Sequence, residues 1–287
     1  MKRLILAGLV ICLLATAFVG CAKEGTLTNE TKPVIVIAAF GTSILEGQKN
    51  LEDADTIVRE RFPGYDVRWG LTAQFIINKL RKTGQTTMFE RKVPIKSVEE
   101  VYADLRKEGK TNVAVQCLLV MAGGEFSQVL MVPTKDLNVK YGYPLLFAPE
   151  NIQNTVRDLS PKFGGTDTVT ILCAHGNGHH PIYNAPLIEM DNYLRKNYKN
   201  AFLATVEGAP GTEQAFADAR KSGCKKVKFI PLMLVAGDHI TNDVMGDDPD
   251  SWKSQLGLPA TAETGMGSDP AVMEIYLKSL DGVLSQF

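Results

Sequence analysis

An apolar, largely β-branched run lies between Pro33 and Gly41 and strongly limits the possible folds. Because nearly every position is apolar, a strand formed here would be buried on both faces, as in parallel sheets covered by helices. Further apolar runs of this kind lie at residues 112–121, 168–174, 201–206 and 226–235. The sequence therefore predicts an α/β fold with parallel sheets flanked by helices.

Segments between these runs predict helices and shorter strands. Ser97 and Glu100 have the spacing of a capping box, and Gly109 ends the helix that it opens. Other helices are expected at residues 44–62, 186–198, 213–222 and 271–284, and shorter strands at 65–71 and 144–148. Strands and helices thus alternate, which indicates βαβ units.

The two halves of the chain resemble each other. Residues 35–43 align with 169–177, and residues 115–125 align with 230–239, each with a shift of one residue. We therefore expect two similar domains, at residues 33–158 and 162–287, that face each other across a cleft.

The first twenty residues have the character of an export signal. Lys2 and Arg3 precede an uncharged, apolar stretch that runs to Gly20. Phe18 to Cys21 approximates a lipobox, in which Cys21 would carry the lipid. Residues 22–32 then read as a linker. We expect an exported protein, periplasmic or held in the membrane as a lipoprotein, although a plain cleaved signal or an uncleaved anchor would also fit.

The charge of the chain does not suggest nucleic acid as a partner, and its cysteines do not suggest a disulfide framework. The net charge is −1 and no Lys/Arg-rich block is present, so nucleic acid is not an expected partner. The five cysteines include no C-x-x-C pair, and Cys117 and Cys173 fall inside apolar runs, which indicates small buried side chains.

The histidines point to the chemistry, because all four lie in the second half. His175, Glu207 and His239 each follow an apolar run of that half, 32 residues apart. Sites in open α/β sheets form at the carboxyl ends of strands, so two imidazoles and a carboxylate would face one crevice. Such donors suit divalent first-row metals. Each residue alone could be structural instead, and His179 and His180 could belong simply to a solvated loop.

Several common enzyme signatures are missing from the sequence. It contains no G-x-G-x-x-G fingerprint, P-loop, G-x-S-x-G elbow or H-E-x-x-H pair. These gaps argue against a dinucleotide enzyme, a nucleotide hydrolase, an α/β-hydrolase and a zinc protease of the usual kinds.

Longer motifs are more specific. The most distinctive is Val-Ala-Gly-Asp-His at residues 235–239, continuing to Asn242-Asp243 and Asp250-Ser-Trp-Lys253. Together with the segments at 175–180, 204–208, 40–43, 112–116 and 124–126, it resembles the CbiK-type sirohydrochlorin cobaltochelatases, and the similarity covers about residues 33–285.

This resemblance implies two chelatase-type domains around a tetrapyrrole cleft and insertion of Co²⁺ into sirohydrochlorin, with loss of two protons. It implies that His175, Glu207 and His239 bind the metal and handle the protons. It also implies a set of residues that contact the tetrapyrrole: Phe40, Gly41, Thr42, Ser43, Glu125 and His180.

The resemblance leaves alternatives open. The protein could instead be an Fe²⁺ chelatase for sirohaem or haem, or Ni²⁺ could replace Co²⁺. The fold could also serve an exported haem, tetrapyrrole or metal carrier. Cys117-Leu-Leu119 stands where the family often has a histidine, so the first half offers no histidine to a haem. A homo-oligomer is expected at the level of the family, and contact with a membrane only through a lipid anchor.

Overall fold

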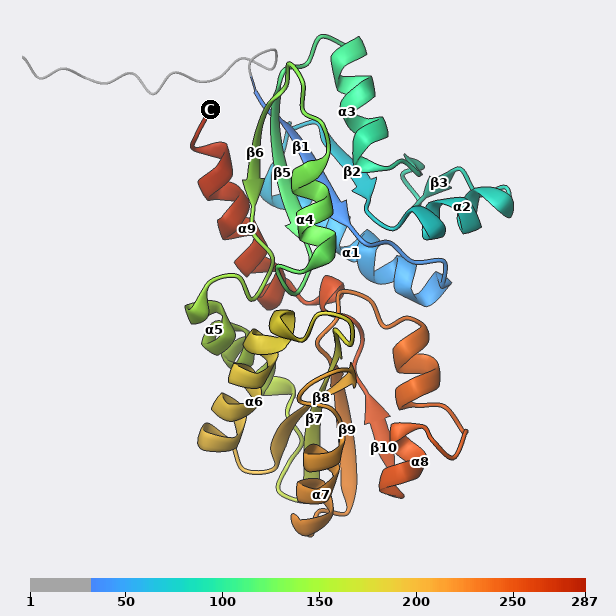
Figure 1. Cartoon of the computed structure of the whole chain (residues 1–287), viewed down its shortest axis with the longest axis vertical. Coiled ribbons are helices and arrows are strands. Elements are labelled where there is room, and N and C mark those ends of the chain that lie inside the picture. The colour runs from blue at the N-terminus through green and yellow to red at the C-terminus, as the bar shows by residue number, and fades with distance from the viewer. Residues whose placement is uncertain (1–31) are drawn as a thin grey trace, which may run out of the picture.

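The computed structural model describes residues 32–287 as two lobes, each built on a four-stranded parallel sheet (Figure 1). The expected export signal, Cys21 and all of the linker except its last residue lie outside the described residues. Within residues 32–287, no helix is both long and apolar enough to cross a membrane.

The first sheet has the order β2-β1-β5-β6. Its central strand β1 is buried along its whole length, because it pairs with β2 and β5 and is covered on both faces. This confirms the parallel arrangement that the apolar run predicted. The strands are β1 (Val34–Ala39), β2 (Val67–Leu71), β5 (Asn112–Leu118) and β6 (Asn138–Gly142).

The second sheet repeats this topology. Its order is β10-β9-β7-β8, so β7 occupies the place of β1, with β8 and β9 on its two sides. The two similar α/β halves expected from the sequence are therefore present. The strands are β7 (Thr168–Gly176), β8 (Ala201–Glu207), β9 (Lys226–Pro231) and β10 (Ala260–Ala262).

Nine α-helices surround the sheets in the described part of the chain. The capping box opens α3 as expected, since the Ser97 side chain accepts from the Glu100 N–H and Glu100 in turn accepts from the Ser97 N–H. The helices are α1 (Leu45–Arg61), α2 (Gln74–Lys82), α3 (Val98–Lys107), α4 (Gly124–Met131), α5 (Pro149–Leu159), α6 (Ala185–Asn197), α7 (Glu213–Lys221), α8 (Trp252–Leu256) and α9 (Pro270–Leu284). A short hairpin of β3 (Thr87–Met88) and β4 (Val93–Pro94) follows α2.

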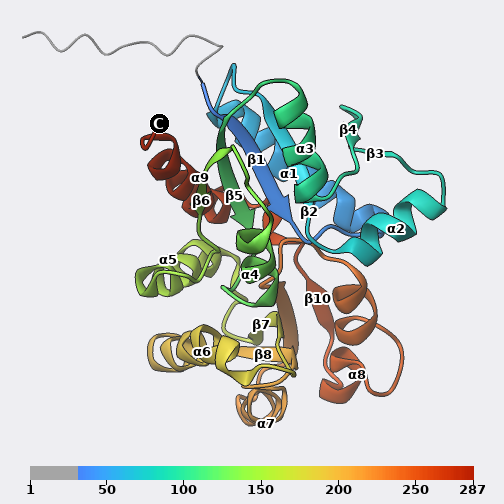
Figure 2. The ribbon, with the colours of Figure 1, turned by 45° about the horizontal axis from the view of Figure 1, so that its top comes forward.

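The last helix of each half, α5 or α9, packs on the other lobe. The last helix, α9, returns to pack on β5 and β6 of the first sheet, whereas α5 packs against α6 of the second lobe (Figure 2). Tyr276 of α9 is fully buried and donates from its hydroxyl to the Leu119 carbonyl. Residues 33–158 and 162–287 therefore each supply one sheet, but their terminal helices do not follow that division.

One predicted strand was misplaced, and another ends earlier than predicted. The fourth strand is not residues 144–148 but β6, whose exposed edge makes its sequence more polar than that of a central strand. The N–H groups of Leu145 and Leu146 donate to the carbonyls of Leu119 and Val120 in a turn instead. The apolar run at 226–235 is only partly strand, because β9 ends at Pro231.

Candidate metal centre

The carboxyl ends of the second sheet point toward the first lobe and carry the predicted metal residues. His175 is the penultimate residue of β7, and Glu207 is the last residue of the neighbouring strand β8. The register pairs Gly176 with Glu207, so both strands end at the same level. As expected from the topology, the two side chains lie at one edge of the sheet.

His239 reaches the same place by a different route. It was expected to end a strand, but it begins the single-turn π-helix η3 (His239–Val244) after an irregular loop that leaves β9. Its imidazole nevertheless meets that of His175 edge to face, with ring centroids 4.7 Å apart and planes at 77°. Short π-helical turns are frequent at functional sites, and this one places His239 beside the end of the central strand.

Both imidazoles are oriented through their Nδ1 atoms. Nδ1 of His175 lies 2.9 Å from the Gly176 carbonyl, and Nδ1 of His239 lies 2.6 Å from Oδ2 of Asp243. A neutral ring that donates from Nδ1 leaves Nε2 unprotonated. Nε2 of each ring is therefore the nitrogen available to ligate a cation or to accept a proton.

Glu207 is close to the pair but turned toward the backbone. Its Oε2 accepts a hydrogen bond of 3.4 Å from the Gly178 N–H. Across residues 32–287, no three His, Cys, Asp or Glu side chains are already gathered as a metal site. Glu207 is exposed, so its carboxylate could turn toward the two imidazoles without disturbing the core. The structure thus brings the His175 and His239 side chains together, whereas the Glu207 carboxylate faces the Gly178 N–H.

Glycine is required beside His175. Gly176 has φ +77°, and a β-carbon there would lie 1.9 Å from the Glu207 carbonyl oxygen. Only glycine allows the ends of β7 and β8 to approach so closely. The loop after Glu207 is held by Thr205, whose hydroxyl donates to the Gly208 carbonyl and accepts from the Gly211 N–H.

The first lobe presents the Phe40–Ser43 loop to this centre. Phe40 is 40% exposed and packs edge to face on Phe75, which is 61% exposed. Thr42 is buried, and its Oγ1 would lie 3.8 Å from a β-carbon on Gly237, two residues before His239. The predicted tetrapyrrole-contacting loop and the His239 loop are therefore neighbours across the boundary between the lobes.

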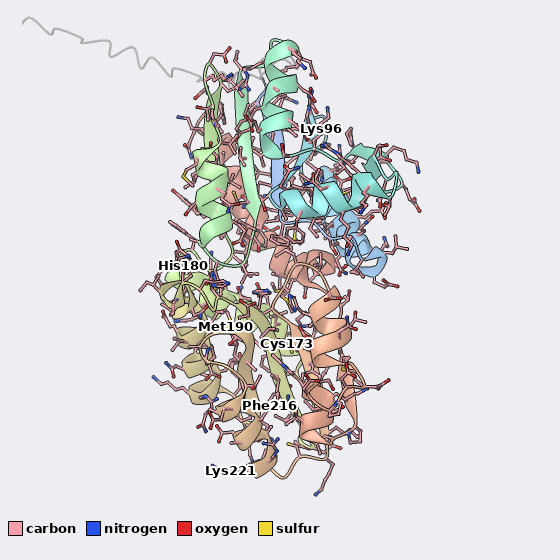
Figure 3. The ribbon with its side chains drawn as sticks, turned by 45° about the vertical axis from the view of Figure 1, so that its right-hand side comes forward. Lys96, Cys173, His180, Met190, Phe216 and Lys221 are labelled. Carbon is pink, nitrogen blue, oxygen red and sulfur yellow. The ribbon has the colours of Figure 1, made fainter. Side chains whose placement is uncertain are left out.

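The remaining predicted contacts lie further along that boundary. Glu125 is in the first turn of α4, and Tyr183 of the second lobe packs near Gly123 at the start of that helix. His180 stacks edge to face on Tyr183, with ring centroids 5.8 Å apart, and lies where the two lobes meet (Figure 3). Glu125 and His180 thus flank the boundary, whereas no contact links either of them to the histidine pair.

An acidic cavity adjoins His239. It has a volume of about 260 Å³, and the carboxylates of Asp243, Asp248 and Asp250 line it together with Trp252. A larger cavity of about 810 Å³ lies between β6, α4, α5 and α9, and none of the predicted site residues lines it. The electrostatic surroundings of the histidine pair are therefore acidic on the side of η3.

Sequence reasoning gave Asp243 no role, although it is the partner of His239. The signal was the spacing: a carboxylate four residues after a histidine can meet it within a helical turn. Without a predicted helix at this point, the spacing had no structural meaning.

Comparison with known proteins gives one family and several relatives. The family model for cobalt chelatase (CbiK) matches residues 33–285. The sirohydrochlorin cobaltochelatase of Salmonella typhimurium is 27% identical over 266 residues, which cover 88% of this chain and 97% of that protein. The sirohydrochlorin cobaltochelatase CbiKC of Nitratidesulfovibrio vulgaris is 29% identical over 238 residues, covering 79% of this chain and 80% of that protein.

Solved structures support the fold. SirB from Bacillus subtilis with Fe³⁺ superposes with a TM-score of 0.59 at 13% identity, covering 89% of this chain and 96% of that one. CbiX, described as the terminal enzyme for biosynthesis of siroheme in denitrifying bacteria, gives a TM-score of 0.53 at 15% identity, covering 88% and 99%. At these identities the likeness concerns the two-lobed chelatase architecture alone.

Proposed function

Because the chain belongs to the cobalt chelatase (CbiK) family, we propose that it inserts Co²⁺ into sirohydrochlorin, a step of cobalamin biosynthesis. In this reaction two pyrrole N–H bonds break, bonds form between cobalt and the ring nitrogens, and two protons leave. No electrons are transferred, so the protein must supply a metal site, proton acceptors and a fixed position for the macrocycle.

The observation that carries the proposal is the pair of imidazoles at 4.7 Å, each with Nδ1 already engaged. Two neighbouring imidazoles whose Nε2 atoms are not engaged can hold a first-row divalent cation or take pyrrole protons near neutral pH. We assign His175 and His239 these two tasks. Glu207 completes the set by turning its carboxylate toward the arriving metal and balancing its charge.

The macrocycle would lie between the histidine pair and the first lobe. The exposed ring of Phe40, supported by Phe75, offers an apolar face that suits a flat tetrapyrrole. Gly41 has φ +90° and keeps the loop close to Leu71 and Ile76, so that the backbone at Thr42 and Ser43 stays at the boundary. Further along the boundary, Glu125 and His180 would contact the periphery of the ring.

The choice of Co²⁺ rests on the family and on the names of the relatives, because histidine and carboxylate ligands also accept Fe²⁺ or Ni²⁺. The test is to mix the purified protein anaerobically with sirohydrochlorin and each metal and to follow the absorbance of the macrocycle. We expect acceleration over the uncatalysed rate, greatest with Co²⁺.

Histidine variants test the site itself. His239→Ala and His175→Ala should each lower the rate by about a hundredfold or more, the scale expected for loss of a metal ligand or proton acceptor. His179→Ala is the matched control, because this histidine is exposed and follows His175 by only four residues. Undiminished insertion by His239→Ala would contradict the assignment.

We also propose that the protein is exported and anchored through Cys21, from the apolar stretch and lipobox-like residues at the start of the chain. Fractionation of cells that express the chain, compared with cells that express Cys21→Ser, tests this proposal.

Export motivates a second candidate function, that of a haem, tetrapyrrole or metal carrier. Tight sirohydrochlorin binding without accelerated insertion would favour the carrier over the enzyme. Light scattering would test the expected homo-oligomer.

A further inference from the structure

A single buried amide from the first lobe holds the loop that carries His239. Asn50 lies in α1 and is almost completely buried. Its Oδ1 accepts a hydrogen bond of 2.9 Å from the N–H of Ala236, three residues before His239. Its Nδ2 donates to the hydroxyls of Thr264 at 2.7 Å and Ser268 at 2.8 Å.

All three bonds cross from the first lobe to the second, and together they use both hydrogens and the oxygen of the amide. A buried amide satisfied in this way has one orientation, because turning it would leave a donor or acceptor without a partner. An apolar side chain could fill the same space, but it could not accept a hydrogen bond from the Ala236 N–H and so could not fix the position of Ala236.

The surroundings are shaped around this amide. A β-carbon on Gly265 would lie 2.7 Å from Oδ1 of Asn50, and one on Gly267 would lie 2.6 Å from its carbonyl oxygen. One turn earlier in α1, a β-carbon on Gly47 would lie 3.4 Å from Cβ of Val235. Glycines therefore let α1, the 264–268 segment and the His239 loop meet at one point.

This loop has left the sheet and needs support from elsewhere. After β9, the carbonyls of Met233 and Leu234 accept from the N–H groups of Met266 and Gly267. The Ala236 N–H then donates to Asn50, and the Gly237 carbonyl begins η3 by accepting from Ile240 and Thr241. Asn50 therefore holds the loop at the point where it turns into the helix of His239.

We propose that Asn50 is a positioning residue for the metal centre, through which the first lobe sets the place of His239 opposite His175. This rests on the proposed function in its use of His239 as a metal ligand. It also means that a movement of the lobes that separated α1 from Ala236 would loosen His239 at the same time.

The test compares Asn50→Ala with Asn50→Leu in the full chain. Both variants remove all three hydrogen bonds. Leucine keeps the number and branching of the side-chain atoms, so it preserves packing between the lobes that alanine loses. Asn78→Ala on α2 is the control, since Asn78 makes an exposed hydrogen bond with Gln74 far from the loop in sequence.

The first measurement is hydrogen–deuterium exchange, which requires no metal. In Asn50→Ala, the peptide containing Ala236 should exchange about tenfold faster, the scale of one lost hydrogen bond. The second is calorimetric titration with Co²⁺ alone, in which Asn50→Ala should bind about tenfold more weakly, as for other residues that orient a ligand. Asn50→Leu should show the same two losses, because it cannot accept from the Ala236 N–H, and Asn78→Ala should change neither.

Unchanged exchange and Co²⁺ affinity in Asn50→Ala would overturn the inference, and so would wild-type values in Asn50→Leu, which would indicate packing alone. If Asn50→Ala does not fold, Thr264→Val removes one of the three bonds and should give a smaller change in the same direction; no change would count against the inference. Failure of the wild-type protein to bind Co²⁺ would contradict the proposed function instead, and the exchange result would still decide the role of Asn50.

Discussion

Replacing Asp243 by asparagine tests whether this carboxylate orients His239, because the substitution should weaken metal binding more than it lowers the stability of the fold. The two side chains are 37% and 44% exposed, so solvent screening limits the contribution of their 2.6 Å contact to about 1 kcal/mol of unfolding free energy or less. A carboxylate that orients a ligating histidine has a larger effect on metal binding. Its loss typically costs about 10- to 100-fold in affinity or activity, or about 1.4–2.7 kcal/mol.

We therefore expect Asp243→Asn to melt within a few degrees of the wild-type protein but to bind Co²⁺ at least about tenfold more weakly. Calorimetric titration gives the affinity and a thermal melt gives the stability. The control is Asp247→Asn, which removes the same charge nearby from a fully exposed side chain that pairs with Lys253. Wild-type affinity in Asp243→Asn, or an equal loss in Asp247→Asn, would refute the role of Asp243 as an orienting group.

Three further predictions concern the scaffold. Gly176→Ala should destabilise the protein by about 2 kcal/mol or more in urea unfolding, because alanine resists φ +77° and would clash with the Glu207 carbonyl. Asp55→Ala should cost roughly 3 kcal/mol, since the buried Trp69 indole N–H loses its acceptor at 2.8 Å; a loss below about 1 kcal/mol would contradict this. Burial raises the pKa of the Cys117 thiol to about 12, so at pH 8 iodoacetamide should label it only after denaturation, as peptide mapping would reveal.

Much of the fold could be predicted because its signals are local. The buried central strand β1 coincides with an unbroken apolar run, and α3 begins at a capping box. The edge strand β6 was misplaced because only its last residue is buried, which removes the apolar pattern on which the prediction depended. Pro144, Leu145 and Leu146 are buried in the turn region that follows.

The site was predictable in its residues more than in its geometry. His175 and Glu207 end adjacent strands as expected, since the order of strands follows from repeated βαβ units. His239 was expected at a strand end, whereas it lies in a π-helical turn whose path depends on Asn50. No pattern around Asn50 distinguishes it from any other polar residue of an amphipathic helix.

Local patterns in the chain were sufficient to predict two parallel sheets, the similarity of the two halves and the kinds of side chain at their carboxyl ends, because strand burial and turn chemistry depend on neighbouring residues. They could not predict that α9 crosses to the first sheet, that the imidazoles of His175 and His239 meet at 4.7 Å, or that Asn50 reaches Ala236. These contacts join residues up to 186 positions apart, and packing of whole elements rather than local sequence sets the distance between them.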